Sequence, residues 1–124
     1  MNTRVLAFGT FDLFHAGHVF FLEQASALGD ELYVSVARDA HIQTLKHHEP
    51  MRDQEARLAT VIRQPCVKSA QLSDETLGSY GVIRSIKPNI IALGFDQDGL
   101  ATDLKRWMRE QGISIELTRL PKRG

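Results

Sequence analysis

The sequence has little cysteine and no excess of either charge, and these two features limit the classes of protein to which it can belong. Cys66 is the only cysteine among 124 residues, so no disulfide can form within the chain. A protein of this kind is compatible with a reducing cytosol. Fifteen Lys and Arg residues balance fifteen Asp and Glu residues, for a formal net charge of zero. Because there is no global basic field to attract nucleic acid or an anionic membrane, any recognition of phosphate must be local.

Long apolar runs are also missing. No run approaches the roughly 18 residues that a membrane-spanning helix needs, and the N-terminus shows no signal-peptide pattern. We therefore expect a cytoplasmic protein without a membrane or nucleic-acid partner. The composition is otherwise ordinary for a globular protein, with 43% hydrophobic and 24% charged residues. This length predicts a single domain over residues 1–124.

Apolar runs alternate with helical patterns along the chain. Strands are predicted at residues 5–8, 31–37, 67–72, 88–94 and 113–117, and helices at 19–25, 39–48, 53–63, 74–86 and 100–111. Gly29 is expected at the C′ position of the first helix, and Asp53 is expected to cap the third. Strands that alternate with helices imply a parallel sheet with right-handed crossovers. The predicted fold class is α/β, with helices on both faces of the sheet.

The most informative stretch lies directly behind the first strand. It reads Gly9-Thr10-Phe11-Asp12-Leu13-Phe14-His15-Ala16-Gly17-His18. A strand, a glycine-led turn and a helix start make an anion site, because the first N–H groups of a helix lack intrahelical partners and lie at its positive end. His15 and His18 add two ring donors on one face of the first turn. Gly17 between them leaves the backbone open to a ligand.

Two other polar stretches follow later strands. Arg38-Asp39 comes after the second predicted strand, and the loop from Gly94 to Gly99 comes after the fourth. In open parallel sheets, ligands bind at the carboxyl ends of strands near the point where the strand order reverses. We therefore expect these stretches and residues 9–18 to converge at one edge of the sheet.

Gly-Thr-Phe-Asp followed by His-x-Gly-His, behind an N-terminal strand, resembles the nucleotidylyltransferase superfamily and specifically its small cytidylyltransferase-like branch. The resemblance implies a three-layer, Rossmann-like sheet. It also implies transfer of a nucleotidyl group from CTP or ATP to a phosphate on an acceptor, with release of pyrophosphate. The divalent metal, Mg²⁺, would arrive on the triphosphate. A homodimer is expected on the same ground.

The resemblance also implies roles for single residues. His15 and His18 match the pair that holds the triphosphate and stabilises the transition state, and Lys46 falls where a phosphate-binding lysine is expected. Asp96 matches the acidic position that contacts the ribose, and Arg119 can match a C-terminal arginine. The expected nucleotide-binding residues are Gly9, Thr10, Phe11, His15, Gly17, His18, Gly94, Asp96 and Arg119. No resident metal site is expected, since only Asp96 or Asp12 could contact substrate-borne Mg²⁺.

Several residues keep an alternative interpretation. Lys46 could be a solvated surface lysine, and Asp96 a turn residue. Arg57 could be the arginine that the family often carries on this helix, or a surface partner of Asp53. Three histidines are interpreted as solvated rather than zinc-binding, because no cysteine stands at zinc-ligand spacing: His41, His47 and His48.

The nucleotide and the acceptor divide the possible functions. Val36-Ala37-Arg38-Asp39 and Leu93-Gly94-Phe95-Asp96-Gln97 look like the archaeal-type FAD synthases, which adenylylate FMN. The C-terminus lacks the Arg-Thr-Glu-Gly-Ile-Ser-Thr-Thr run of glycerol-phosphate cytidylyltransferases. We therefore predict conversion of ATP and FMN to FAD. One alternative is a CTP enzyme acting on glycerol 3-phosphate or a similar phosphorylated alcohol. Another is a non-catalytic nucleotide-binding regulatory module, against which the intact histidine pair and Lys46 argue.

Overall fold

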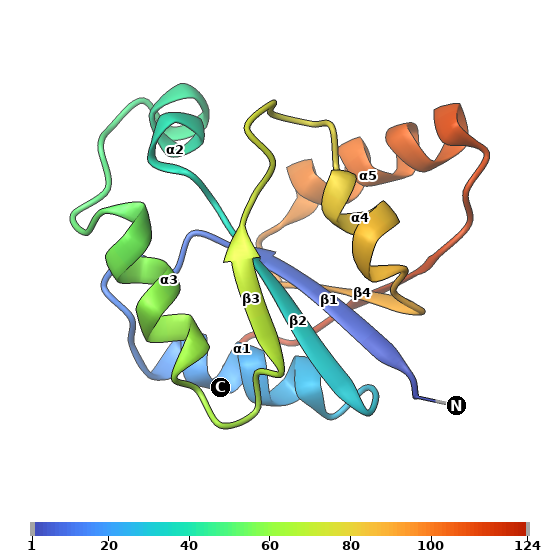
Figure 1. Cartoon of the computed structure of the whole chain (residues 1–124), viewed down its shortest axis with the longest axis horizontal. Helices are drawn as coiled ribbons and strands as arrows, with labels where there is room; N and C mark the ends of the chain where they lie inside the picture. Colours follow the sequence, from blue (N-terminus) through green and yellow to red (C-terminus); the bar gives the residue numbers. More distant parts are fainter. Residues whose placement is uncertain (1, 124) are drawn as a thin grey trace.

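The computed structural model describes residues 2–123, and within them five strands form one parallel sheet (Figure 1). The central strand β1 (Arg4–Gly9) pairs with β2 (Glu31–Val36) on one side and with β4 (Ile90–Leu93) on the other. The edge strands are β3 (Ser69–Leu72) and β5 (Glu116–Arg119), which gives the order β3-β2-β1-β4-β5. The predicted parallel α/β sheet is confirmed.

Helices cover both faces of this sheet, as Figure 1 shows. One face carries α1 (Ala16–Ser26) and α3 (Gln54–Ile62), and the other carries α4 (Gly81–Ile86) and α5 (Asp98–Gln111). The remaining helix, α2 (Asp39–Lys46), lies beyond the carboxyl ends of the strands. No helix among residues 2–123 is both long and apolar enough to cross a bilayer.

The two-residue period of β1 divides the core between the faces. Val5 and Ala7 pack with the side chains of α1 and α3, whereas Leu6 packs with those of α4 and α5. All three side chains are fully buried. A central parallel strand that is buried on both faces is expected to be continuously apolar, and this accounts for the run at residues 5–8.

Three predicted boundaries were wrong. The helix predicted from residue 74 begins at Gly81, because Gly78 and Tyr80 have positive φ values of 83° and 50°, which a right-handed helix cannot contain. The last strand lies at 116–119 rather than 113–117, in register with β4 from Ile90 onward. Gly29 is not a left-handed C′ residue, since α1 ends at Ser26 with Ala27 as its C-cap and Gly29 has no positive φ. Its missing Cβ instead leaves room for the Thr3 carbonyl, which a Cβ would approach to 2.8 Å.

Arg57 on α3 joins three segments from inside the protein. Its guanidinium is 0% exposed and donates hydrogen bonds to the Asp39 carboxylate at 2.6 Å, the Thr10 carbonyl at 2.7 Å and the Arg52 carbonyl at 3.0 Å. The suggested surface pair with Asp53 was therefore wrong, because Asp53 caps α3 by accepting from the Ala56 N–H. Arg57 fixes the loop after β1 to the start of α2 and to α3.

We predict that Arg57→Ala lowers the free energy of unfolding by about 2–4 kcal/mol, because two backbone carbonyls lose a donor at roughly 1–3 kcal/mol each. Arg57→Lys should recover only part of this loss, since an ammonium cannot reproduce the forked geometry of a guanidinium. Urea denaturation measures both variants. Arg63→Ala is the matched control, because that side chain is exposed at the end of the same helix. Equal stability of the Arg57→Ala and Arg63→Ala proteins would contradict the role given to Arg57.

Candidate active site

A cavity of about 1200 Å³ opens at the carboxyl ends of β1, β2 and β4. This is where the strand order reverses, because the chain continues from β1 to β2 and β3 on one side and returns to β4 on the other. Nine of the residues predicted from sequence line it: Gly9, Thr10, Phe11, His15, Gly17, His18, Lys46, Gly94 and Asp96. The predicted convergence of distant polar stretches is thus present, and the individual roles of these side chains stay predictions.

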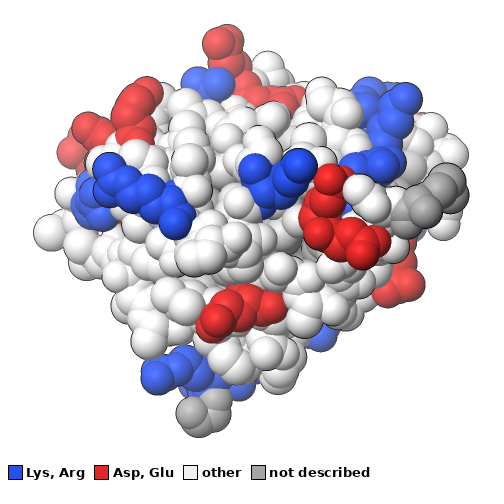
Figure 2. All heavy atoms as spheres, turned by 60° about the horizontal axis from the view of Figure 1, so that its bottom comes forward, with Lys and Arg blue, Asp and Glu red and all other residues white. Residues whose placement is uncertain are grey.

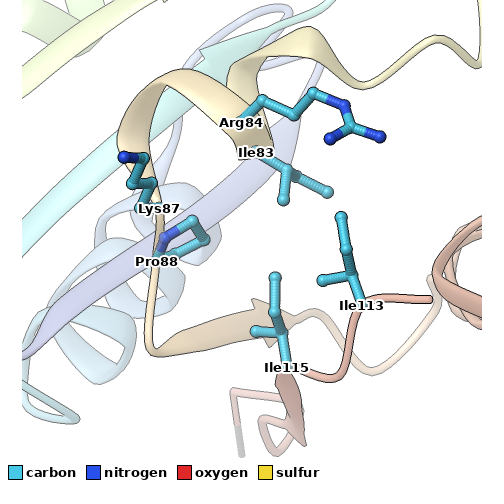
Figure 3. A pocket seen from close by; sticks show the side chains of 6 residues that line it. All are labelled: Ile83, Arg84, Lys87, Pro88, Ile113 and Ile115. Atoms are coloured by element: carbon cyan, nitrogen blue, oxygen red, sulfur yellow. The ribbon is translucent and has the colours of Figure 1, made fainter. Parts of the chain in front are cut away.

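A smaller hollow of about 390 Å³ lies at the opposite, amino end of β4 (Figure 3). Isoleucines from α4 and from the segment before β5 line it, together with Pro88 and two cations, Arg84 and Lys87. Its lining offers no carboxylate, imidazole or hydroxyl for acid–base chemistry. The large cavity is therefore the candidate active site.

His15 and His18 are held by the start of α1 itself. His15 is the N-cap residue, and its Nδ1 accepts a hydrogen bond from the Gly17 N–H at 3.0 Å. Nδ1 of His18 accepts from the His15 N–H at 3.2 Å, which completes a reciprocal capping box. The two rings stack with their centroids 4.0 Å apart. Because both Nδ1 atoms are acceptors, each neutral ring carries its proton on Nε2 and can offer that N–H to a ligand.

Glycines and an aromatic side chain support this pair. A Cβ on Gly17 would lie 2.8 Å from Cε1 of His15, so the glycine makes room for the histidine ring as well as for a ligand. Phe11 adopts a positive φ of 54° and packs edge-on against His18 at 5.6 Å. A Cβ on Gly9 would lie 2.6 Å from the Phe11 ring. The two glycines therefore leave the space that the Phe11 and His15 rings occupy.

The surroundings of His18 favour its neutral form. Burial lowers its pKa below the usual value, and the nearby charges of His15 and Lys46 lower it further. The carboxylates of Asp12 and Asp96 oppose this shift without reversing it. Near neutral pH, His18 is therefore a neutral Nε2–H donor rather than a cation.

Gln97 is a structural part of the site that sequence reasoning missed. Its side-chain oxygen accepts from the Gly94 N–H at 2.8 Å, and its amide nitrogen donates to the Phe8 carbonyl at 2.9 Å. The side chain thereby joins the carboxyl ends of β4 and β1 and shapes the loop that carries Asp96. In the sequence, the one sign of this role is that Gln97 closely follows a strand that ends in glycine.

Arg119 is not among the residues that line the cavity. It instead donates to the Asp98 carboxylate at 2.6 Å and to the Phe95 carbonyl at 3.3 Å. Two later cations, Lys122 and Arg123, line the cavity in its place. Arg119 was matched to a nucleotide-binding arginine by its position in the sequence, and that position gives no sign that Asp98 lies beside it in the fold.

Asp12 also differs from its suggested role as a contact for Mg²⁺. Its carboxylate accepts the backbone N–H groups of Met51 and Arg52 at 2.8 and 3.0 Å and is not among the cavity-lining groups. Burial acts to raise its pKa, but these two N–H groups and the charge of Arg57 lower it overall. Asp12 therefore fastens the segment after α2 to the loop after β1.

The three histidines interpreted as solvated have different surroundings. His47 and His48 are exposed, as expected. His41 is buried and lines the cavity, with its Nε2 at 3.0 Å from the Glu75 carbonyl, so that interpretation was wrong for it. The helical period of α2 turns His41 and Ile42 inward together. Within residues 2–123, no three or more His, Cys, Asp or Glu side chains cluster as a metal site would require.

Charge is dispersed on the surface that Figure 2 displays, where basic and acidic side chains alternate without an extended patch of either sign. This agrees with the formal net charge of zero. Recognition of a polyanionic ligand therefore depends on the local donors of the cavity. These are the two Nε2–H groups, the start of α1 and the cations at the rim.

A strand, a capped histidine pair and a cavity at the reversal of strand order define a nucleotidyltransferase-type site. The sequence profile described as Cytidylyltransferase-like matches residues 6–121, and the chain belongs to this family. The resemblance stated from the motif is confirmed.

Relatives with assigned names are similar over nearly the whole chain. A protein named FAD synthase from Methanosarcina mazei is 43% identical over 119 residues, which cover 96% of this chain and 77% of that protein. Another, from Thermococcus onnurineus, is 40% identical over 118 residues, covering 95% and 79%. The crystal structure of a lipopolysaccharide core biosynthesis protein from Thermoplasma volcanium has a TM-score of 0.90 and 34% identity, with both chains covered completely.

We predict that the His18 ring titrates below its usual pKa of 6.5 in the folded protein. The unfolded chain then binds more protons just below pH 6.5, so this contribution to stability is present above 6.5 and is lost as the pH falls through the folded pKa. A proton on Nδ1 would also break the bond from the His15 N–H. NMR titration of the ring protons measures the pKa, with His18→Asn to assign the signal. A His18 pKa at or above 6.5 would contradict this description of the site.

Proposed function

We propose that the protein transfers the adenylyl group of ATP to the phosphate of FMN, which forms FAD and pyrophosphate. The observation that carries the proposal is the pair of Nε2–H donors, held at the start of α1 by their own Nδ1 bonds and lining a cavity of about 1200 Å³. Ligand pockets usually measure about 300–1000 Å³, so this cavity has room for two substrates. The relatives named FAD synthase support the choice of nucleotide and acceptor.

The chemistry needs positioning more than a protein nucleophile. An oxygen of the FMN phosphate attacks the α-phosphorus of ATP, and the bond from that phosphorus to the β-phosphate oxygen breaks. The electron pair of that bond leaves with pyrophosphate. Negative charge grows on the oxygens around the α-phosphorus, where donors fixed in advance are most effective. His15 and His18 supply such donors, and Lys46 adds a positive charge at the cavity wall.

Magnesium enters the proposal as part of the substrate. Mg²⁺ is commonly held by substrate phosphates and one or two carboxylates. Asp96 is exposed and lines the cavity, whereas Asp12 is engaged by backbone N–H groups. Asp96 is therefore the carboxylate available to a metal–triphosphate complex or to the ribose. A homodimer and a cytoplasmic location also stay part of the proposal, and the family resemblance and the single cysteine support them.

The protein should form FAD when supplied with ATP, FMN and Mg²⁺, and excess chelator should stop the reaction. ATP should also raise the melting temperature more than CTP at equal concentration, because stabilisation by a ligand grows with the logarithm of its concentration over Kd and reaches about 2.7 kcal/mol at a hundredfold excess. Chromatography of the flavin products and thermal melting measure the two effects. Stronger protection by CTP, with pyrophosphate release only on a phosphorylated alcohol, would favour the cytidylyltransferase alternative. Tight nucleotide binding without turnover would favour the regulatory module.

His15→Asn and His18→Asn should each lower turnover about a hundredfold to a thousandfold, the usual effect of removing one transition-state donor. Asparagine places an oxygen near the position of Nδ1 in both variants and is a good N-cap residue at position 15, so the bonds at the helix start are kept while the Nε2–H is lost. Melting temperatures should stay near that of the parent. His48→Asn is the matched control, because His48 is exposed and does not line the cavity. Near-parental activity of both motif variants would exclude the histidine pair from catalysis.

A further inference from the structure

The lining of the large cavity comes from two groups of elements, which we call its two halves. One half is lined from β4 and the segment after β5, where Gly94, Asp96 and Lys122 lie. The other is lined from β2, α2 and the loop between β3 and α4, and its walls include Leu77, Tyr80 and Val82. If the nucleotide occupies the half that carries Asp96, as the proposed function implies, the other half remains for the acceptor.

Ser35 lies in this second half with an unused hydrogen-bonding group. The residue is 1% exposed and lines the cavity from β2. It pairs in register with Phe8, so its side chain projects toward the face covered by α4 and α5. Among the described residues, its Oγ is the one buried side-chain nitrogen or oxygen that has no hydrogen-bond partner. Buried polar groups normally have a hydrogen-bond partner, so an unpartnered Ser35 hydroxyl suggests that a ligand supplies one.

Two neighbouring polar side chains of this half, Asp74 and Ser73, are already engaged. The Asp74 carboxylate accepts from the Ser79 hydroxyl and from the Gly81 N–H, both at 2.5 Å. Ser73 Oγ lies 3.3 Å from the Arg38 N–H and 3.4 Å from Nδ1 of His41. These bonds fix the loop after β3. Ser35 Oγ is left as the buried hydroxyl of this half without a hydrogen-bond partner.

The apolar wall beside Ser35 is held rigidly. Tyr80 adopts a positive φ of 50°, which is unusual for a large side chain. Its hydroxyl donates to Asp103 at 2.5 Å, and its ring packs edge-on against Phe8 at 5.9 Å and Trp107 at 5.6 Å. Burial raises the pKa of this hydroxyl, which therefore stays protonated. A strained residue that its neighbours hold so firmly is typical of a ligand-binding wall.

We propose that Ser35 is a specificity residue for the acceptor, and that its hydroxyl bonds the polar edge of a planar heteroaromatic ring lying against Tyr80, Leu77 and Val82. The inference rests on the proposed function and deepens it. A flavin ring combines apolar and hydrogen-bonding edges, which suits an apolar wall with one unfilled hydroxyl. A small phosphorylated alcohol has no surface to cover that wall. In this proposal, Ser35 contacts the acceptor and not the nucleotide.

The test compares Ser35→Ala with the parent in FAD formation. KM for FMN at saturating ATP should rise about three- to tenfold, the equivalent of one neutral hydrogen bond. KM for ATP at saturating FMN should stay within about twofold of the parent value, because the hydrogen bond that the variant loses is to FMN and not to ATP. The melting temperature without ligand should not fall, because alanine removes a hydroxyl that bonds nothing in the free protein. Ser114→Ala is the control, because that serine is exposed and outside the cavity lining.

Each other outcome overturns the inference in a recognisable way. Unchanged KM values would mean that the hydroxyl meets only water. A rise in KM for ATP alone would place the nucleotide, not the acceptor, against Ser35. A lower melting temperature with an unchanged KM for FMN would make the role structural. If the parent itself forms no FAD, the proposed function fails, whereas FAD formation that is identical in parent and variant removes only the assignment of Ser35.

Discussion

The double pairing of β1 is the constraint on which the site depends. This strand bonds β2 on one side and β4 on the other, and all of these strands run parallel. The segments that leave their carboxyl ends therefore diverge, and a cavity opens at the end of β1. The stretch at residues 9–18 and the Asp96 loop are far apart in sequence, yet they line one cavity because their strands end at the same edge.

The same atoms stabilise the fold and prepare the chemistry. Nδ1 of His15 and Nδ1 of His18 satisfy N–H groups at the start of α1, which any helix must satisfy in some way. In doing so they orient each ring and place its proton on Nε2. An aspartate would cap the helix equally well but would offer no donor. The capping bonds account for the Nδ1 atoms of the two rings, and the Nε2–H groups take no part in them.

Sequence periodicity predicted the parallel sheet and its two helical layers, because apolar periods and the alternation of strands with helices can be seen in a sequence. The motif at residues 9–18, together with the family resemblance, supplied the nine predicted residues that line the cavity. Arg57, Gln97 and Arg119 were missed or misplaced because their partners lie far along the chain or on another element. The start of α4 was missed because Tyr80 takes a left-handed conformation that tertiary contacts impose on it.

The neutral His18 ring differs in its effect from the cations Lys46, Lys122 and Arg123, which also line the cavity. A cation attracts a triphosphate before and after reaction alike, and the product pyrophosphate would share that affinity. Uniform binding of this kind lowers KM without raising turnover. In the proposed reaction, the Nε2–H of His18, whose pKa is lowered by burial, would instead respond most to the charge that grows on the phosphoryl oxygens. In this proposal, selectivity for the transition state depends on how firmly the rings are oriented, and the Nδ1 hydrogen bonds at the start of α1 orient them.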